Sequence, residues 1–312
     1  MSTMSRRRSA GPLYLEQTET EPKAATTATT TTTTTTTESQ NMMHSHPISQ
    51  PLTPVTQKPT AQVALRILRQ LQPHVAQAHI DSRDWTKFGI TCGQLDLGWK
   101  SENEGGFLRL IPSEKMHQLA SQYGFDSLRE LHPDPDHPFY NSAAVTDHLN
   151  GYLFSVYEND FLVRRSKWTC REPDDWEAPK TQYFPNDGKW QVECMLAVRD
   201  GHSPHMNCTL LEAEALKEDT LMFSEVWSIL ILTVFSLRHP QNKKYEVVPV
   251  TVVTVSGTTF RVVQGFADGK AGSVRIRKSS IVSLGPDKET MKEQMMLIVS
   301  WLLAEPVWPS EH

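Results

Sequence analysis

The most regular pattern of apolar positions lies in the C-terminal half of the chain. It begins at residues 209–212, which read Thr-Leu-Leu-Glu. This is a capping box, in which a hydroxyl and a carboxylate satisfy free amides in the first turn of a helix. A long apolar run follows and ends at Leu237, just before Arg238-His239-Pro240. The sequence therefore predicts one long helix from Thr209 to Leu237, kinked near residue 219.

Three runs rich in β-branched residues follow this helix, at positions 245–255, 258–266 and 273–281. A Ser-Gly pair and an Asp-Gly pair separate them, and both pairs are typical of β-hairpin turns. A last amphipathic helix begins after Asp287, and Pro306 ends it. We therefore expect an α+β fold, in which a long buried helix and a C-terminal helix flank an antiparallel three-strand meander.

The N-terminal half shows shorter periodic segments. Apolar residues recur at helical spacing in three stretches, at residues 61–71, 113–123 and 145–161. A strand is expected at 190–198, after a proline-rich loop from Cys170 to Gly188. Because this loop is rich in proline and acidic residues, it is the best candidate for a boundary between two parts of the fold.

Composition divides the chain into four parts. Residues 1–60 contain few large apolar side chains and an unbroken threonine run from Thr29 to Thr37. Such a segment buries too little apolar surface to offset an ordering cost of about 1–2 kcal/mol per residue. We predict a disordered tail over 1–60, a mixed helical lobe with loops over 61–188, an α+β core over 189–305 and a short tail over 306–312.

Charge, cysteine usage and hydropathy restrict the class of protein. The chain has 312 residues and a net charge of −5, which argues against a whole-protein affinity for nucleic acid. Its four cysteines are scattered, and the N-terminal arginines lack the apolar segment of a secretory signal. The apolar segment Leu221–Leu237 has 17 residues and contains Glu225, whereas a membrane span needs about 20. We expect an intracellular protein, cytoplasmic or nuclear, without a membrane span.

Two clusters of residues have the chemistry of metal ligands. The first consists of Cys194, His202, His205 and Cys208, since zinc takes four sulfur and nitrogen ligands in tetrahedral geometry. Its spacing differs from that of a common zinc finger, and an ordinary polar loop is the alternative. The second cluster lies in a proline-rich segment and consists of His132, Asp134, Asp136 and His137. A solvated, exposed loop is the alternative there.

A basic face is expected on the meander. Strand alternation puts Arg275 and Arg277 on one side of the third strand, with Lys278 next to them and Arg261 on the neighbouring strand as a further member. Residues 243–278 carry seven basic and two acidic side chains. Such a face could hold a phosphate-bearing ligand or an acidic protein partner. A solvated sheet face is the alternative.

No familiar catalytic or nucleotide-binding motif occurs in the chain. Gly-rich phosphate loops, zinc-protease helices and nucleophile elbows are all missing from the sequence. We therefore expect a non-enzymatic binding or accessory protein that uses the basic face and needs no cofactor. The alternatives are a small zinc-stabilised domain and a divergent, inactive enzyme dependent on a metal such as magnesium.

The order helix, three antiparallel strands and helix resembles the core of restriction-endonuclease-like nucleases. That resemblance implies a metal-binding acid at the end of the second strand, where this chain has Asp268, with Glu212 or Glu225 as a further ligand. The family places a glutamate and a lysine on the third strand, whereas this chain has Arg275-Ile276-Arg277. An arginine in place of the glutamate would repel magnesium, so the resemblance implies a shared fold without the activity.

The last 110 or so residues are also similar to uncharacterised proteins of filamentous fungi. The resemblance rests on Val248-Pro249-Val250, on Arg261-Val262-Val263-Gln264, on the run from Val274 to Ser279 and on a helix ending in Trp301-Leu302-Leu303. It implies a common fold and no particular activity.

Overall fold

The computed structural model of the protein describes residues 58–98, 106–122, 138–154, 162–171, 189–199, 201, 203–285 and 287–307. All of them belong to one compact unit, His46–His312. Most of the tail predicted over 1–60 and most of the tail predicted over 306–312 lie outside the described residues. Helices and strands share the described chain, as the expected α+β class requires.

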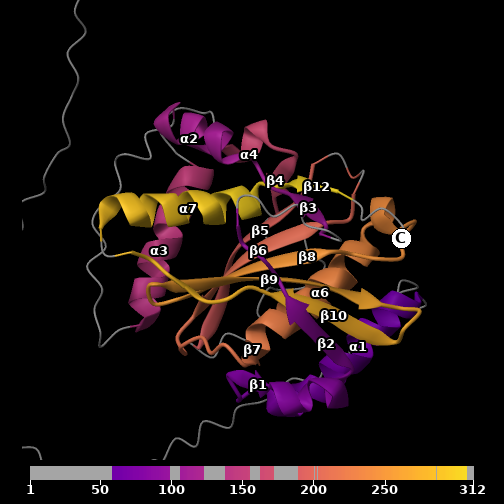
Figure 1. Ribbon diagram of the computed structural model, residues 1–312. Helices are drawn as coiled ribbons and strands as arrows, with labels where there is room; N and C mark the ends of the chain where they lie inside the picture. Colours follow the sequence, from indigo (N-terminus) through magenta and orange to yellow (C-terminus); the bar gives the residue numbers. More distant parts are fainter. Residues whose placement is uncertain are drawn as a thin grey trace, which may run out of the picture. The chain divides into compact units, whose positions relative to one another are not determined.

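Eight strands of the described chain form one mixed sheet (Figure 1). In spatial order they are β2 (Ile90–Gln94), β10 (Ser273–Lys278), β9 (Thr259–Asp268), β8 (Val250–Ser256), β6 (Met206–Glu212), β5 (Trp190–Val198) and β4 (Trp168–Cys170), with β11 (Val282–Ser283) beside β9. Neighbouring strands are antiparallel except β2 with β10 and β6 with β8, which are parallel.

The predicted three-strand meander is therefore only part of the sheet. The antiparallel pairing of β8 with β9 and of β9 with β10 is confirmed. The Ser256-Gly257 turn is confirmed as well, and Gly257 has a φ of 58°, which favours glycine. The expectation of a sheet limited to these strands is wrong, because β8 also pairs with β6 and β10 with β2. Both extensions are parallel pairs between segments distant in sequence, and local hairpin signals do not reveal them.

The helix predicted to begin at Thr209 is a strand there instead. Every residue of β6 is buried, since β6 lies between two strands and has helices on both faces. A strand buried on both faces is a continuous apolar run, and this run resembles the buried side of a helix. The helix, α6 (Phe223–Arg238), begins later. Met222 is its N-cap residue, and Glu225 in the first turn accepts a hydrogen bond from the Met222 amide at 2.8 Å.

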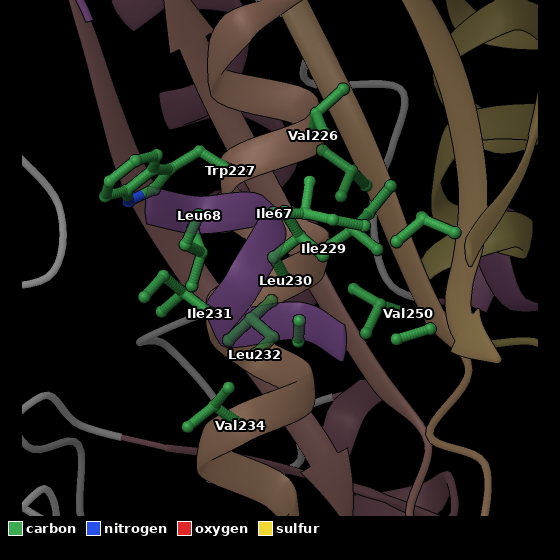
Figure 2. Packing of buried hydrophobic residues seen from close by; sticks show 14 of the residues in the cluster. Ile67, Leu68, Val226, Trp227, Ile229, Leu230, Ile231, Leu232, Val234 and Val250 are labelled. Carbon is green, nitrogen blue, oxygen red and sulfur yellow. The ribbon is translucent and has the colours of Figure 1, made fainter. Parts of the chain in front are cut away.

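Helix α6 makes the crossover that the parallel pair β6–β8 requires. It packs against β8 and β9, and α1 (Pro59–Leu71) covers its outer side. Figure 2 shows Ile67 and Leu68 of α1 against the apolar side chains of α6. Because it is covered by the sheet and by α1, α6 is buried on almost every side. The helix also packs closely on Gly265 of β9, where an added methyl group would lie 3.0 Å from the Ile229 side chain.

The opposite face of the sheet has its own apolar core. Four helices contribute to it: α2 (Ser113–Gln122), α3 (Pro138–Leu153), α4 (Leu162–Arg165) and α7 (Lys288–Leu302). The buried stripe predicted for the last helix is confirmed, since Met291, Met295, Ile298 and Leu302 are all buried. Asp287 caps this helix by accepting a hydrogen bond from the Thr290 amide at 2.9 Å.

Short elements complete the described chain. They are β1 (His79–Asp81) paired with β7 (Thr220–Met222), β3 (Leu108–Arg109) paired with β12 (Glu305–Pro306), and the short helices η2 (Gln72–His74), η3 (Ser82–Phe88) and η6 (Pro240–Asn242). Strands β2 and β4, from the stretch predicted as a helical lobe, are the two end strands of the main sheet. Among the described helices, none combines the length and the apolar character needed to cross a bilayer.

Candidate anion-binding face of the sheet

Two arginines of β10 lie on the same face of the sheet. Arg275 is in register with Thr91 of β2 and Phe266 of β9, and Arg277 is in register with Gln264 of β9. Thr91 and Arg275 are exposed, while Arg277 and Phe266 are partly exposed. We call these five residues the open face. Its core is a pair of guanidinium groups beside one aromatic ring.

The Arg277 side chain is held in place by neutral groups. Its Nη2 atom donates a hydrogen bond to Gln264 Oε1 at 3.1 Å, and the buried Gln264 amide donates in turn to Thr251 Oγ1 at 3.3 Å. Burial lowers the pKa of Arg277 from its usual value. Within the described chain, no carboxylate forms an ion pair with Arg277. A half-buried cation without a counter-ion is a typical feature of an anion-binding site.

Arg275 lies nearer the surface and is partly neutralised. Its Nη2 atom lies 2.9 Å from Asp268 Oδ2, and its guanidinium lies 6.0 Å from the centre of the Phe266 ring. The Phe266 ring packs edge-to-face on Phe107, with 5.1 Å between the ring centres. Because the Arg275 side chain is 59% exposed, its ion pair contributes little to stability. Arg275 is therefore free to exchange Asp268 for another anion.

The other two cations predicted for this face lie elsewhere. Arg261 is in register with Thr254 and points to the opposite face, towards α6, where its side chain is completely buried. Lys278 is also on that face, is buried, and donates a hydrogen bond to the carbonyl of Glu218. The expected four-residue basic face is therefore corrected to Arg275 and Arg277. Residues next to each other on a strand point to opposite faces, which separates Lys278 from Arg277.

Arg261 belongs to a buried ion pair instead. Its Nε and Nη2 atoms donate to the two carboxylate oxygens of Glu225 at 2.8 and 2.6 Å. Its Nη1 atom donates to the carbonyls of Lys217 and Thr220. Burial alone would lower the pKa of Arg261, but nearby negative charge, chiefly the Glu225 carboxylate, raises it, and the pKa lies above its usual value. Because each of the three guanidinium nitrogens of Arg261 donates within the fold, its role is structural.

The carboxylates expected for a nuclease-like metal site are not brought together. Glu225 contacts Arg261, and Glu212 accepts a hydrogen bond from Ser224 at the same end of the sheet. Asp268 lies seven residues beyond Arg261 on β9, which is roughly 23 Å at ~3.3 Å per residue. Its Oδ1 atom accepts bonds from the Lys270 and Ala271 amides and shapes the turn after β9.

The expected zinc ligands are also separated. Cys194 packs in the apolar core on the α7 side of the sheet, whereas Cys208 packs in the core on the α6 side. His205 is buried beside Phe107, and its Nδ1 atom is paired with the Ser203 hydroxyl. His202 lies outside the described residues, as do all four members of the His132–His137 cluster. Among the residues that the structure does describe, no three metal-ligating side chains come together.

His205 predicts a specific pH dependence of stability. Burial lowers the pKa of His205 to about 4, whereas an unfolded histidine has a pKa of ~6.5. Below that value the unfolded chain binds a proton that the folded chain does not, so stability falls as the pH drops towards 4. We expect a loss of about 2 kcal/mol between pH 7 and 5, measured by urea unfolding.

The variant His205→Gln is the control for this effect. It removes the titrating group, so its stability should change less between pH 7 and 5 than that of the wild type. Parallel pH profiles for the two proteins would contradict the assignment.

Sequence reasoning missed the two β9 residues that complete the open face. Gln264 and Phe266 have the alternation needed to share a face, but only the register of β9 with β10 shows that they lie beside the arginines. The polar Gln264 in the apolar stretch between Arg261 and Asp268 was the available signal, since a buried amide needs a partner.

Comparison with known proteins adds no homologue to this description. No protein-family model matches the chain, and a search of curated proteins finds no significant similarity. The resemblances to fungal proteins and to nucleases therefore stay predictions.

Proposed function

We propose that the protein is a non-enzymatic binding or accessory protein that holds an anionic group of its partner on the open face. Arg277 is the anchor, and Arg275 is a second, more mobile cation. The observation that carries the proposal is the half-buried Arg277, which neutral Gln264 orients and which no described carboxylate pairs with.

The surroundings of Arg277 favour an oxyanion over other ligands. A planar guanidinium presents its donors as a fork that matches phosphate and carboxylate oxygens. Partial burial reduces screening by water, so each charge-assisted hydrogen bond is stronger than at an exposed arginine. Hydrogen bonds from Arg277 to Gln264 and from Gln264 to Thr251 orient the guanidinium before the ligand binds. This lowers the conformational entropy lost on binding.

The remainder of the open face suggests how the rest of the partner is held. Phe266 offers an apolar surface beside the two arginines, and Thr91 offers a hydroxyl at the edge strand. A phosphate-bearing ligand and an acidic protein segment both present negatively charged oxygens, which are the groups that the two arginines select. Binding should weaken as salt rises, because both arginines are accessible to solvent ions.

The variant Arg277→Gln tests this function. We expect the affinity for phosphoserine, followed by NMR titration, to fall roughly 10-fold or more, since a charge-assisted hydrogen bond contributes ~1.5–3 kcal/mol. A second titration with a glutamate-rich peptide distinguishes an acidic protein segment from a phosphate ligand.

Lys243→Gln is the matched control, because it removes the same charge from an exposed residue in the loop after α6. It should bind both probes as the wild type does. Thermal unfolding checks that Arg277→Gln is folded. If wild type and Arg277→Gln bind both probes equally, the open face is not the binding site.

A further inference from the structure

Strand β2 is an end strand of the main sheet, with β10 on its inner side (Figure 1). The Gly89 carbonyl, just before β2, and the Leu95 amide, just after it, both form hydrogen bonds with β10. Alternate residues of a strand direct their backbone groups to the same side. The N–H and C=O groups of Ile90, Cys92 and Gln94 therefore point to the outer edge of β2. Among the described strands, none pairs with that edge.

The outer edge of β2 lacks the features that usually prevent pairing with another chain. Proteins protect an end strand by keeping it very short or by placing charged residues and proline on it. Strand β4, at the other end of the sheet, has three residues and lies between Lys167 and Arg171. Strand β2 has five residues and contains neither a charge nor a proline. Three of them, Thr91, Gly93 and Gln94, are exposed, so this edge is open to one more strand.

The side chains of β2 leave the two arginines of the open face accessible from this edge. Gly93 is in register with Arg277 and has no side chain, and the small Thr91 is in register with Arg275. A methyl group added at Gly93 would lie 3.8 Å from Arg277 Cγ, so a long side chain there would cover that arginine. An added strand would lie two strand spacings from β10, roughly 10 Å. An arginine and an acidic side chain together span this distance.

We propose that an extended acidic segment of a partner protein adds to β2 as a ninth strand of the sheet. Acidic side chains at positions i and i+2 of that segment meet Arg275 and Arg277, which are also two residues apart and share a face. Main-chain hydrogen bonds to the outer edge of β2 supply affinity, and the arginines select the acidic sequence. This inference rests on the proposed function and specifies its partner. A second copy of the chain is disfavoured, because two-fold pairing of β2 with β2 would add two more arginines to the same face.

Hydrogen exchange of the full chain tests the pairing directly. The probe is the acetylated and amidated peptide Ser-Thr-Glu-Thr-Glu-Thr-Ser, followed by NMR. At about 90% saturation, the Cys92 and Gln94 amides should exchange roughly ten-fold more slowly, because they exchange only from the free fraction. The Thr91 and Gly93 amides, which face β10, are the internal control and should change less. Binding that leaves the Cys92 and Gln94 amides exchanging as in the free protein would overturn the proposal.

Two N-methylated peptides separate main-chain pairing from charge. One carries N-methyl groups on its two glutamates and the other on two of its threonines, so both keep the same charge. Only alternate amides of a strand face its neighbour, so only one of the two peptides should lose affinity. The loss should be roughly ten-fold or more, the effect of two hydrogen bonds, and the peptide affected shows the direction of the added strand. Equal affinities for all three peptides would mean binding by charge alone, which overturns this inference and leaves the proposed function intact.

Two variants assign the edge and the charge separately. Gln94→Pro removes one outward amide and places a ring on the edge, so it should weaken the peptide roughly ten-fold or more. Free phosphoserine, which has no extended backbone, should bind Gln94→Pro as it binds the wild type. Arg277→Gln should weaken both probes, and thermal unfolding checks that each variant is folded.

Three outcomes would overturn the ninth strand. They are an absence of saturation by about 1 mM peptide, full peptide binding by a folded Gln94→Pro variant, and a dimer of the chain in sedimentation experiments that the peptide dissociates. The last would assign the edge to a second copy. Equal binding of both probes by wild type and Arg277→Gln would instead contradict the proposed function, so the two failures are distinguishable.

Discussion

Replacing Glu225 by alanine should lower the free energy of unfolding by about 3–5 kcal/mol. Both side chains of the Glu225–Arg261 pair are completely buried, and their two hydrogen bonds measure 2.6 and 2.8 Å. Removing the carboxylate leaves the Arg261 guanidinium in the core without a counter-charge. It also removes an acceptor from Thr254 and from the Met222 amide that begins α6.

Urea unfolding at pH 7 measures this loss. Glu214→Ala is the matched control, because Glu214 is exposed and its removal should change stability by less than about 0.5 kcal/mol. The double variant Glu225→Leu with Arg261→Met should recover much of the loss, since an apolar pair of similar volume leaves no buried charge. A single-variant effect below about 1 kcal/mol would mean that water reaches the pair.

Replacing Trp168 by alanine should destabilise the protein by about 3–5 kcal/mol, the usual cost of truncating a buried aromatic side chain. Trp168 has no exposed surface, although it belongs to β4, an end strand of the sheet. Its Nε1 atom donates to the carbonyl of Ala304, just after α7, at 2.8 Å. The side chain therefore connects the end strand β4 to the segment after α7 in two ways, by packing of its ring in the core and by its hydrogen bond.

Two further variants separate these contributions. Trp168→Phe keeps most of the ring but leaves the Ala304 carbonyl without its donor, so it should lose about 1–3 kcal/mol. Tyr140→Ala removes an aromatic side chain that is 71% exposed, and should change stability by less than about 0.5 kcal/mol. Urea unfolding should give the largest loss for Trp168→Ala, a smaller loss for Trp168→Phe and the smallest for Tyr140→Ala. A Trp168→Ala loss as small as that of Tyr140→Ala would contradict the assignment.

Arg261 and Arg277 show how a similar sequence environment leads to different roles. Both lie in strands among β-branched residues, and the sequence pattern predicts them to be members of one basic face. In the fold, Arg261 faces α6 and meets Glu225, whereas Arg277 faces away from α6 and meets only the neutral Gln264. Successive residues of a strand point to opposite faces of the sheet. The face that each arginine occupies, together with the register between strands, decides that Arg261 is paired with a carboxylate and Arg277 is not.

Turn residues and apolar periodicity predicted the structure correctly where the contacts join neighbouring segments of the chain. The hairpin at Ser256-Gly257, the antiparallel order of the last three long strands and the buried stripe of α7 all follow from short patterns. The error at Thr209 has a physical cause as well. A strand buried on both faces and a buried helix have the same continuous apolar sequence, and Glu212 happened to complete a capping pattern.

The sequence alone determined that three antiparallel strands follow one another within residues 245–281, that a buried helix precedes them and that an amphipathic helix follows them. Only the tertiary structure decided that β6 and β2 join the sheet by parallel pairing, that Arg261 is buried with Glu225, and that the outer edge of β2 lies beside the open face. The reason is that periodicity records which side of its own element a residue occupies. Which residues face it across the core depends on register and crossover connections between distant segments.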